Sequence, residues 1–134
     1  MLKTAENILS KLPSDVQYAD VRVVDQESEE IATKDGVVEA LHSSTSVGYN
    51  VRILKDGVWG FAASYDMTPD GIDVTIKKAL AIVDASLQHK TTDVKLDDSK
   101  PVVASYKTPI LEDPFLVPIE EKLALLIAAD RAQK

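Results

Sequence analysis

The sequence predicts an α+β fold, with an antiparallel β-meander sheet of about five strands packed against about two or three helices. Three observations lead to this prediction. Runs of alternating apolar and polar residues follow one another between residues 18 and 64. The tripeptide Lys-Asp-Gly, whose Asp-Gly pair is typical of hairpin turns, occurs twice between such runs. Segments with apolar residues at helical spacing flank this region on both sides.

Two helices are predicted before the last third of the chain. Apolar residues recur at helical spacing over residues 2–12, and Pro13 ends this run. A longer helix is expected after Thr68, which can cap it, with Pro69 at its first position. This helix should end near residues 89–90, where His and Lys suit the negative end of the helix dipole.

The sequence after residue 90 predicts a loop, an edge strand and a third helix. Residues 91–100 are polar and indicate a surface loop, and residues 102–106 indicate a strand that Pro101 would place at a sheet edge. A helix opens near Pro118 and still runs at the last residue, without a Gly or Pro to stop it. We therefore expect residues 1–134 to be a single domain cut from a longer chain.

Five extended runs provide the predicted strands. Each alternates apolar and polar residues, as a half-buried strand does. The runs cover residues 18–24, 28–33, 37–44, 48–54 and 58–63. Lys34-Asp35-Gly36 and Lys55-Asp56-Gly57 separate two pairs of them, so each pair is predicted to form a hairpin.

The second hairpin allows two registers. A two-residue Asp56-Gly57 turn would pair Leu54 with Trp59. A three-residue loop, with Gly57 in the left-handed conformation, would instead pair Ile53 with Trp59. The longer loop gathers the apolar residues of both strands on one face, and burial favours the register that does so. We therefore predict the three-residue loop.

One mixed aromatic and cationic group is a candidate functional surface. Its members are Arg52, Trp59 and Phe61, which belong to the second hairpin. In the favoured register the two aromatic residues belong to the core and Arg52 lies on the opposite, solvated face. The alternative is that the three residues form an interface with another domain or subunit, or line a substrate channel, because Arg and aromatic residues are enriched at such contacts.

Composition excludes several classes of protein. The formal net charge of −7 argues against direct binding to nucleic acid, which requires clustered cations. The chain has no cysteine, so disulfides and thiolate metal sites cannot form within it. No stretch approaches the roughly 20 apolar residues of a membrane span. The N-terminus has no apolar run typical of a secretory leader. These features favour a cytoplasmic protein without membrane contact.

Residues for catalysis or metal binding are not apparent. The only histidines, His42 and His89, have no further ligand at a spacing typical of metal sites. Neighbouring acids such as Glu29 and Glu30 do not by themselves specify a catalytic cleft. No glycine-rich phosphate loop is present. We expect no catalytic, cofactor-binding or metal-binding residue in this chain.

Four segments resemble the N-terminal domain of the TldD/PmbA family, nearer to its TldD branch. The most similar segment runs from Gly48 to Ala63 and contains Val51-Arg52 and Asp56-Gly57 followed by Trp59-Gly60-Phe61-Ala62. The other three segments are residues 18–23, 34–39 and 113–122. Because the four occur in the family's order, the resemblance covers most of the chain.

The resemblance implies a function for the longer protein. Family members resemble zinc metallopeptidases whose metal is held by an H-E-x-x-x-H helix and a later cysteine, none of which occurs here. It therefore implies a non-catalytic N-terminal domain, inactive alone, that shapes a peptide channel and takes part in a homo- or hetero-oligomer with a TldD/PmbA-type subunit. The alternative is a protein-binding regulatory module without enzymatic activity, since the family has also been described as modulators of DNA gyrase.

Overall fold

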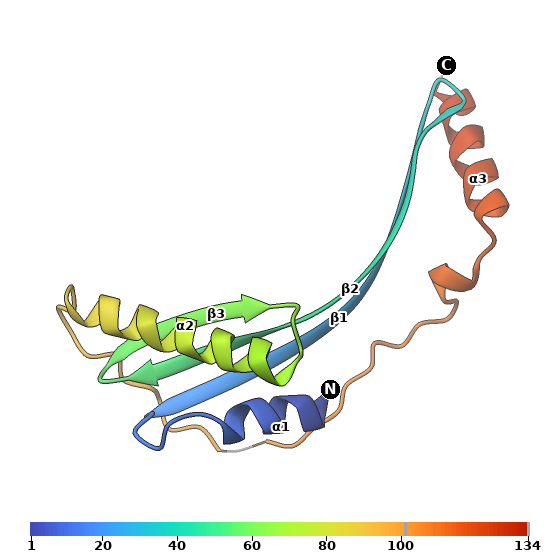
Figure 1. Cartoon of the computed structure of the whole chain (residues 1–134). Coiled ribbons are helices and arrows are strands. Elements are labelled where there is room, and N and C mark those ends of the chain that lie inside the picture. Colours follow the sequence, from blue (N-terminus) through green and yellow to red (C-terminus); the bar gives the residue numbers. More distant parts are fainter. Residues whose placement is uncertain (101, 134) are drawn as a thin grey trace. The chain divides into compact units, whose positions relative to one another are not determined.

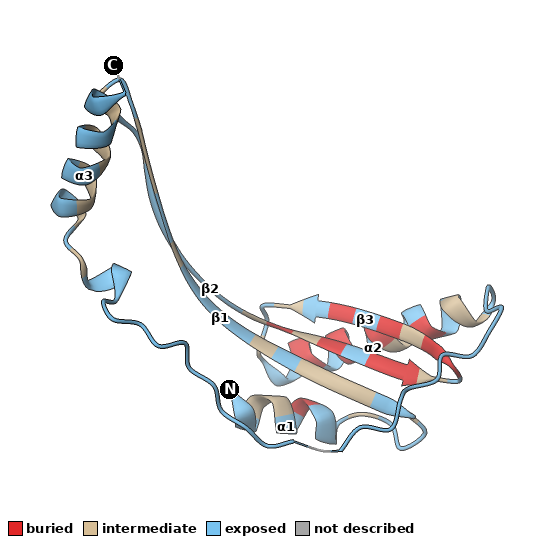
Figure 2. Cartoon of the chain, turned by 180° about the vertical axis from the view of Figure 1, so that it is seen from behind, coloured by how far each residue is buried: buried red, intermediate tan, exposed pale blue. Residues whose placement is uncertain are grey.

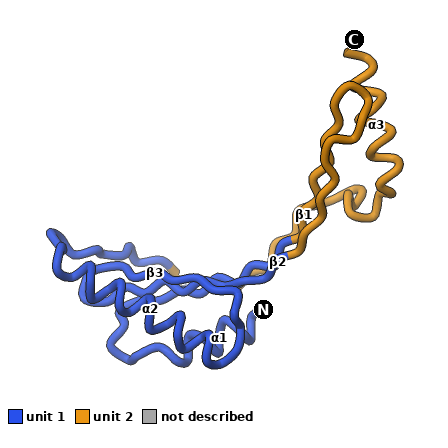
Figure 3. The backbone as a smooth tube through the Cα atoms, turned by 45° about the horizontal axis from the view of Figure 1, so that its top comes forward, with its two compact units in different colours: residues 1–26, 46–99 blue, residues 27–45, 100–134 orange. Residues whose placement is uncertain are grey.

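The computed structural model describes residues 1–100 and 102–133 and contains both helices and strands (Figure 1). The elements in chain order are α1 (Leu2–Ser10), β1 (Tyr18–Lys34), β2 (Val37–Lys55), β3 (Val58–Ser64), α2 (Pro69–Leu87), the 3₁₀ turn η1 (Pro114–Leu116) and α3 (Ile119–Ala132). The chain divides into two compact units, residues 1–26 with 46–99 and residues 27–45 with 100–134 (Figure 3). Each unit is described by itself below.

The predicted α+β class is confirmed, but the prediction of about five strands is wrong. The described residues form a three-stranded antiparallel sheet in the order β1-β2-β3. The first two predicted strands are continuous in β1, and the next two are continuous in β2. Residues 25–27 and 45–47 contain neither Gly nor Pro, the residues that interrupt a strand most strongly, and both strands continue through them.

The three predicted helices are present and begin where expected, but each ends two or three residues earlier than predicted, at Ser10, Leu87 and Ala132, and the last predicted strand is absent from the described residues. The α2 helix begins at Pro69, and the Thr68 side chain caps it by accepting a hydrogen bond from the Gly71 N–H at 3.1 Å. His89 lies just beyond the end of this helix. Residues 102–106 form no strand, and Pro101 lies outside the described residues. An isolated run of this kind has no neighbouring strand to pair with, so its β-propensity alone is insufficient.

The first unit has a hydrophobic core on one face of its sheet. Alternate residues of β2 point into this core, where they meet α2 and, from α1, the fully buried Ile8. Figure 2 shows buried segments in red on α1, α2, β2 and β3. The buried cluster comprises Ile8, Tyr49, Val51, Ile53, Val58, Ala62, Ile72, Ile76, Ala79 and Val83. The Tyr49 hydroxyl donates to Thr75 Oγ1 at 3.0 Å, so this buried polar group is satisfied.

The β2–β3 turn contradicts the predicted three-residue loop. Asp56 and Gly57 form a two-residue turn with φ values of 51° and 74°, and Leu54 therefore pairs with Trp59. Close packing explains this register. A Cβ at Gly60 would overlap the carbonyl oxygen of Ala79 in α2, so Gly60 must face the helix. The bulkier neighbours of Gly60 then face away from the helix.

The second unit consists of a hairpin and α3. Asp35 and Gly36 form its turn, with φ values of 55° and 79°. Contacts that join the hairpin to the helix include an ion pair, in which Lys122 Nζ lies 2.5 Å from Glu29 Oε1, and a hydrogen bond that the Gly36 N–H donates to Asp130 Oδ2 at 3.2 Å. None of the described residues of this unit is fully buried. Its apolar side chains therefore retain surface that these elements alone do not cover.

Candidate contact surface on the open face of the sheet

Five side chains gather on the face of the first unit's sheet that points away from α2. Alternation along the strands places them there, because the residues before and after them point into the core. We call this set the aromatic–arginine surface. It comprises Tyr18 and Asp20 from β1, Arg52 from β2, and Trp59 and Phe61 from β3.

Arg52 is held at the centre of the aromatic–arginine surface. Its guanidinium carbon lies 4.7 Å from the centre of the Trp59 ring, a cation–π geometry. Its Nη2 atom lies 2.6 Å from Asp20 Oδ2, and its Nε donates to the same oxygen at 2.8 Å. The hydrogen bond to Asp20 raises the pKa of Arg52 above its ordinary value, and the charge of Asp20 adds to this effect. The guanidinium is therefore charged and oriented before any partner arrives.

The aromatic side chains form a small apolar layer on the same face. The rings of Tyr18 and Trp59 meet edge to face, with centroids 5.9 Å apart and an interplanar angle of 89°. Leu54, the partner of Trp59 in the register, is only 3% exposed although it points away from α2. Phe61 pairs with Arg52 and remains 51% exposed. The layer thus ends in an uncovered aromatic ring.

The structure corrects the predicted placement of the candidate residues. Trp59 and Phe61 do not belong to the core, and Arg52 shares their face rather than lying opposite. The two-residue turn is the reason, because a shift of one residue in β3 moves every side chain to the other face. The sequence therefore identified three residues that lie together but assigned them to different faces.

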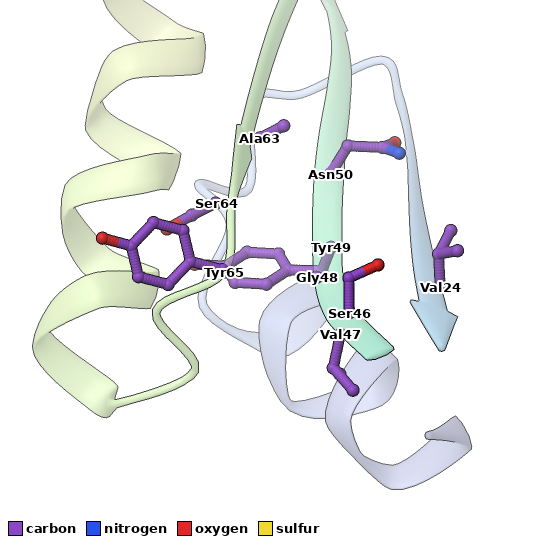
Figure 4. Close-up of a pocket in the computed structure, with 9 residues that line it drawn as sticks. All are labelled: Val24, Ser46, Val47, Gly48, Tyr49, Asn50, Ala63, Ser64 and Tyr65. Atoms are coloured by element: carbon purple, nitrogen blue, oxygen red, sulfur yellow. The ribbon is translucent and has the colours of Figure 1, made fainter. Parts of the chain in front are cut away.

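A shallow hollow adjoins this surface at the far end of β3. Its lining residues are Val24, Ser46, Val47, Gly48, Tyr49, Asn50, Ala63, Ser64 and Tyr65 (Figure 4). Tyr65 is 86% exposed, and a Cβ at Gly48 would lie 3.3 Å from the Ser64 carbonyl oxygen. The lining is mainly apolar, so the hollow can accept an apolar side chain of a polypeptide.

Sequence reasoning missed the hollow. Its residues come from the ends of two strands whose pairing was assigned incorrectly. The available signal was Tyr65 directly after the last strand, with Gly48 near the start of the partner segment. Because Gly48 has no side chain, the space beside the large Tyr65 side chain stays open to a partner. Only the pairing of Tyr49 with Ser64 shows that Gly48 and Tyr65 are neighbours.

The remaining candidate residues do not converge. His42 is exposed on β2 in the second unit, and His89 is exposed beyond α2 in the first. Glu29 is in an ion pair with Lys122, which is a structural contact. Residues 1–100 and 102–133 contain no group of three His, Asp or Glu side chains that could hold a metal ion. No described helix is long and apolar enough to cross a membrane.

The comparisons with known proteins agree with the resemblance in the sequence. Residues 19–83 match the model of PmbA/TldA metallopeptidase domain 1. The chain is 33% identical to a metalloprotease of Methanocaldococcus jannaschii over 119 residues, which are 89% of this chain and 26% of that protein. It is 29% identical to a metalloprotease of Methanothermobacter thermautotrophicus over 126 residues, or 94% of this chain and 26% of that protein. The chain thus spans about a quarter of the length of these relatives.

A metallopeptidase family implies a metal, and the described residues do not fit one. Structural and catalytic zinc sites use at least three side-chain ligands from Cys, His, Asp or Glu. The sequence has no cysteine, and the two histidines belong to different compact units. The described residues therefore provide no set of ligands for a catalytic metal.

Proposed function

Because this chain belongs to the TldD/PmbA family, we propose that it is the non-catalytic N-terminal domain of a TldD-like zinc metallopeptidase that acts on peptides. The relatives that carry the name metalloprotease extend over about four times the matched length. The zinc ligands would come from the part of the protein outside residues 1–134. The role of this domain would be to shape access to the catalytic site and to support assembly.

The family match carries the metallopeptidase part of this proposal, and the observation that carries the contact role is the aromatic–arginine surface with its adjoining hollow. Phe61 is half exposed, Tyr65 is almost fully exposed, and Arg52 is already oriented by Asp20. Aromatic residues and Arg are enriched at protein contacts, where they bury a large area. We propose that Arg52, Trp59 and Phe61 contact another domain or subunit of the protease, or line its substrate channel.

Several further properties follow from this proposal. The partners would be the remainder of the same protein and a second TldD/PmbA-type subunit, identical or paralogous, together with the peptide substrate. The net charge of −7 gives no support to direct contact with nucleic acid. The absence of cysteine is compatible with a reducing compartment, and we propose a cytoplasmic location.

The second candidate is a protein-binding regulatory module without enzymatic activity, of which gyrase modulation is one version. The exposed aromatic–arginine surface supports this candidate too, since it could receive any protein partner. The native open reading frame separates the two. A continuation with H-E-x-x-x-H and a later cysteine supports the peptidase, whereas a stop near residue 134 supports the module.

Two matched variants of the full-length protein test the role of the surface. Phe61→Ala removes a 51% exposed ring from the surface, and Val74→Ala removes a 50% exposed side chain from α2. We expect Phe61→Ala to weaken subunit assembly or to lower the chelator-sensitive kcat/KM for an unfolded peptide, whereas Val74→Ala leaves both unchanged. Equal behaviour of the two variants would contradict the proposed contact surface.

A further inference from the structure

The tetrapeptide Lys-Asp-Gly-Val occurs twice in this chain, at residues 34–37 and 55–58. In an Asp-Gly pair the glycine nitrogen can attack the preceding side-chain carboxyl group, because glycine has no side chain to obstruct it. The two copies have the same neighbours, so their intrinsic reactivity is the same. Any difference between them must come from the folded structure.

The turn at Asp56-Gly57 is enclosed by other segments of the first unit. The Gly57 N–H donates to Gln17 Oε1 at 2.9 Å, and its carbonyl accepts from the Val94 N–H at 2.8 Å. Lys90 Nζ donates to the Asp56 carbonyl at 2.9 Å. Gly57 is buried, and a Cβ there would lie 2.8 Å from Asp93 Oδ1. Rotation of the backbone at this turn would break several of these contacts.

The turn at Asp35-Gly36 has more space. No atom lies within 4 Å of the position of a Cβ at Gly36, and Gly36 is only partly buried whereas Gly57 is buried; Asp35 and Asp56 are both exposed. The Gly36 N–H, which is the attacking group, donates to Asp130 Oδ2 at 3.2 Å. This contact links the turn to the last turns of α3. Asp130 therefore holds the nitrogen that the reaction requires.

We propose that Asp35 is a site of spontaneous isoaspartate formation and that Asp130 restrains the reaction. The Gly36 nitrogen forms a bond to Asp35 Cγ, and a carboxylate oxygen leaves as water with the proton from that nitrogen and one proton from the solvent, which the later opening of the ring returns. Water then adds to the main-chain carbonyl of the resulting five-membered succinimide and breaks its bond to the Gly36 nitrogen. The chain then continues through Cγ, with no change in mass and no oxidant or reductant.

This modification would alter the second unit specifically. It lengthens the backbone by one carbon, because the chain then runs through Cβ and Cγ of Asp35. The former main-chain carbonyl of Asp35 becomes a free carboxylate on its Cα. A two-residue turn with positive φ at both positions has a fixed number of backbone atoms, so an additional atom is incompatible with its geometry. The hydrogen bond between the Gly36 N–H and Asp130 would then be lost, and the turn would no longer be held against α3.

Ageing of the purified chain at neutral pH and 37 °C tests the proposal, with isoaspartate located by electron-transfer fragmentation in a mass spectrometer. We expect isoaspartate at Asp35 to exceed that at Asp56 by about fivefold or more, the factor that corresponds to breaking the hydrogen bond between the Val94 N–H and the Gly57 carbonyl. In concentrated guanidinium chloride the two sites should react equally. Equal rates in the folded chain, or unequal rates in the unfolded chain, would overturn the assignment.

Three variants of α3 test the restraint. Asp130→Ala removes the acceptor and should raise the rate at Asp35 by about fivefold. Asp130→Asn keeps an acceptor oxygen and should raise it less. Leu125→Ala, at a 73% exposed position of the same helix, controls for a general effect on α3 and should leave the rate unchanged. An unchanged rate in Asp130→Ala, or equal increases in Asp130→Ala and Leu125→Ala, would overturn the role of Asp130.

Discussion

The guanidinium carbon of Arg52 lies 4.7 Å above the Trp59 ring, so both residues belong to the open face of the sheet. This relationship exists because Arg52 and Trp59 are on neighbouring strands and point the same way. It also explains why Trp59 is only half-buried. The side chain is covered by Arg52 and Tyr18 rather than by a helix.

Truncation of Trp59 should therefore cost less stability than truncation of a core residue. We expect Trp59→Ala to lower the free energy of unfolding by about 1–2 kcal/mol, because only part of the ring surface is removed from water. Ile53→Ala, at a fully buried position, should cost about 2–5 kcal/mol. Urea denaturation of the isolated chain measures both. A larger loss for Trp59→Ala than for Ile53→Ala would contradict the observed register.

Gly60 should tolerate no side chain. A Cβ there would overlap the Ala79 carbonyl oxygen and lie 2.7 Å from Val83 Cγ2. Because the first of these atoms belongs to the backbone of α2, the helix would have to move, and we expect Gly60→Ala to cost about 1–3 kcal/mol or more. Ala63→Ser, on the exposed face of the same strand, serves as the control and should change the denaturation midpoint little.

The two turn glycines should respond differently to substitution. Both have positive φ, so Gly→Ala is strained at either position by about 1–2 kcal/mol. Gly57→Ala carries a further cost, because its Cβ would lie 2.8 Å from Asp93 Oδ1, whereas Gly36→Ala meets no atom within 4 Å. Gly57→Val should be worse still, since a β-branched residue disfavours positive φ. Thermal unfolding of the three variants ranks these costs, and a smaller loss for Gly57→Ala than for Gly36→Ala would be inconsistent with the enclosed turn.

The stability of the chain should fall in acid because the Asp66 carboxylate, just before α2, becomes protonated. Asp66 Oδ1 accepts hydrogen bonds from the Thr68 hydroxyl at 2.6 Å and the Thr68 N–H at 3.0 Å, and these bonds hold the pKa of Asp66 below its ordinary value of 3.8. The stabilisation is therefore complete above that value and is lost as the pH falls through the lower folded-state pKa.

Thermal midpoints between about pH 6 and pH 2 test this prediction. Asp66→Asn removes the titrating group, so its midpoint should fall less steeply over the acidic part of this range than that of the unmodified chain. Lys90 lowers the pKa of Asp93 through a hydrogen bond and therefore adds a similar contribution, which Asp93→Asn isolates. Parallel curves for the unmodified chain and both variants would disprove the assignment.

The sequence by itself determined the elements whose signals are local. Thr68 and Pro69 specify the start of α2, because the cap and the first turn depend on adjacent residues. Asp-Gly located both turns, because Gly adopts positive φ readily and Asp tolerates it, but the two-residue length of the second turn was not predicted. The TldD/PmbA resemblance is likewise carried by the order of short motifs, and the family match confirms it.

Only the tertiary structure decided the number of strands and the faces of the second hairpin. The alternation of residues along each strand, including Arg52 in β2 and Trp59 in β3, was predicted correctly. The sequence did not determine which face of each strand turns toward α2. The choice depends on Gly60, whose missing side chain lets the Ala79 carbonyl approach β3. That contact joins residues far apart in the sequence, so it could not be predicted from the residues of the hairpin alone. The same contact sends Phe61 outward and thereby forms the candidate surface.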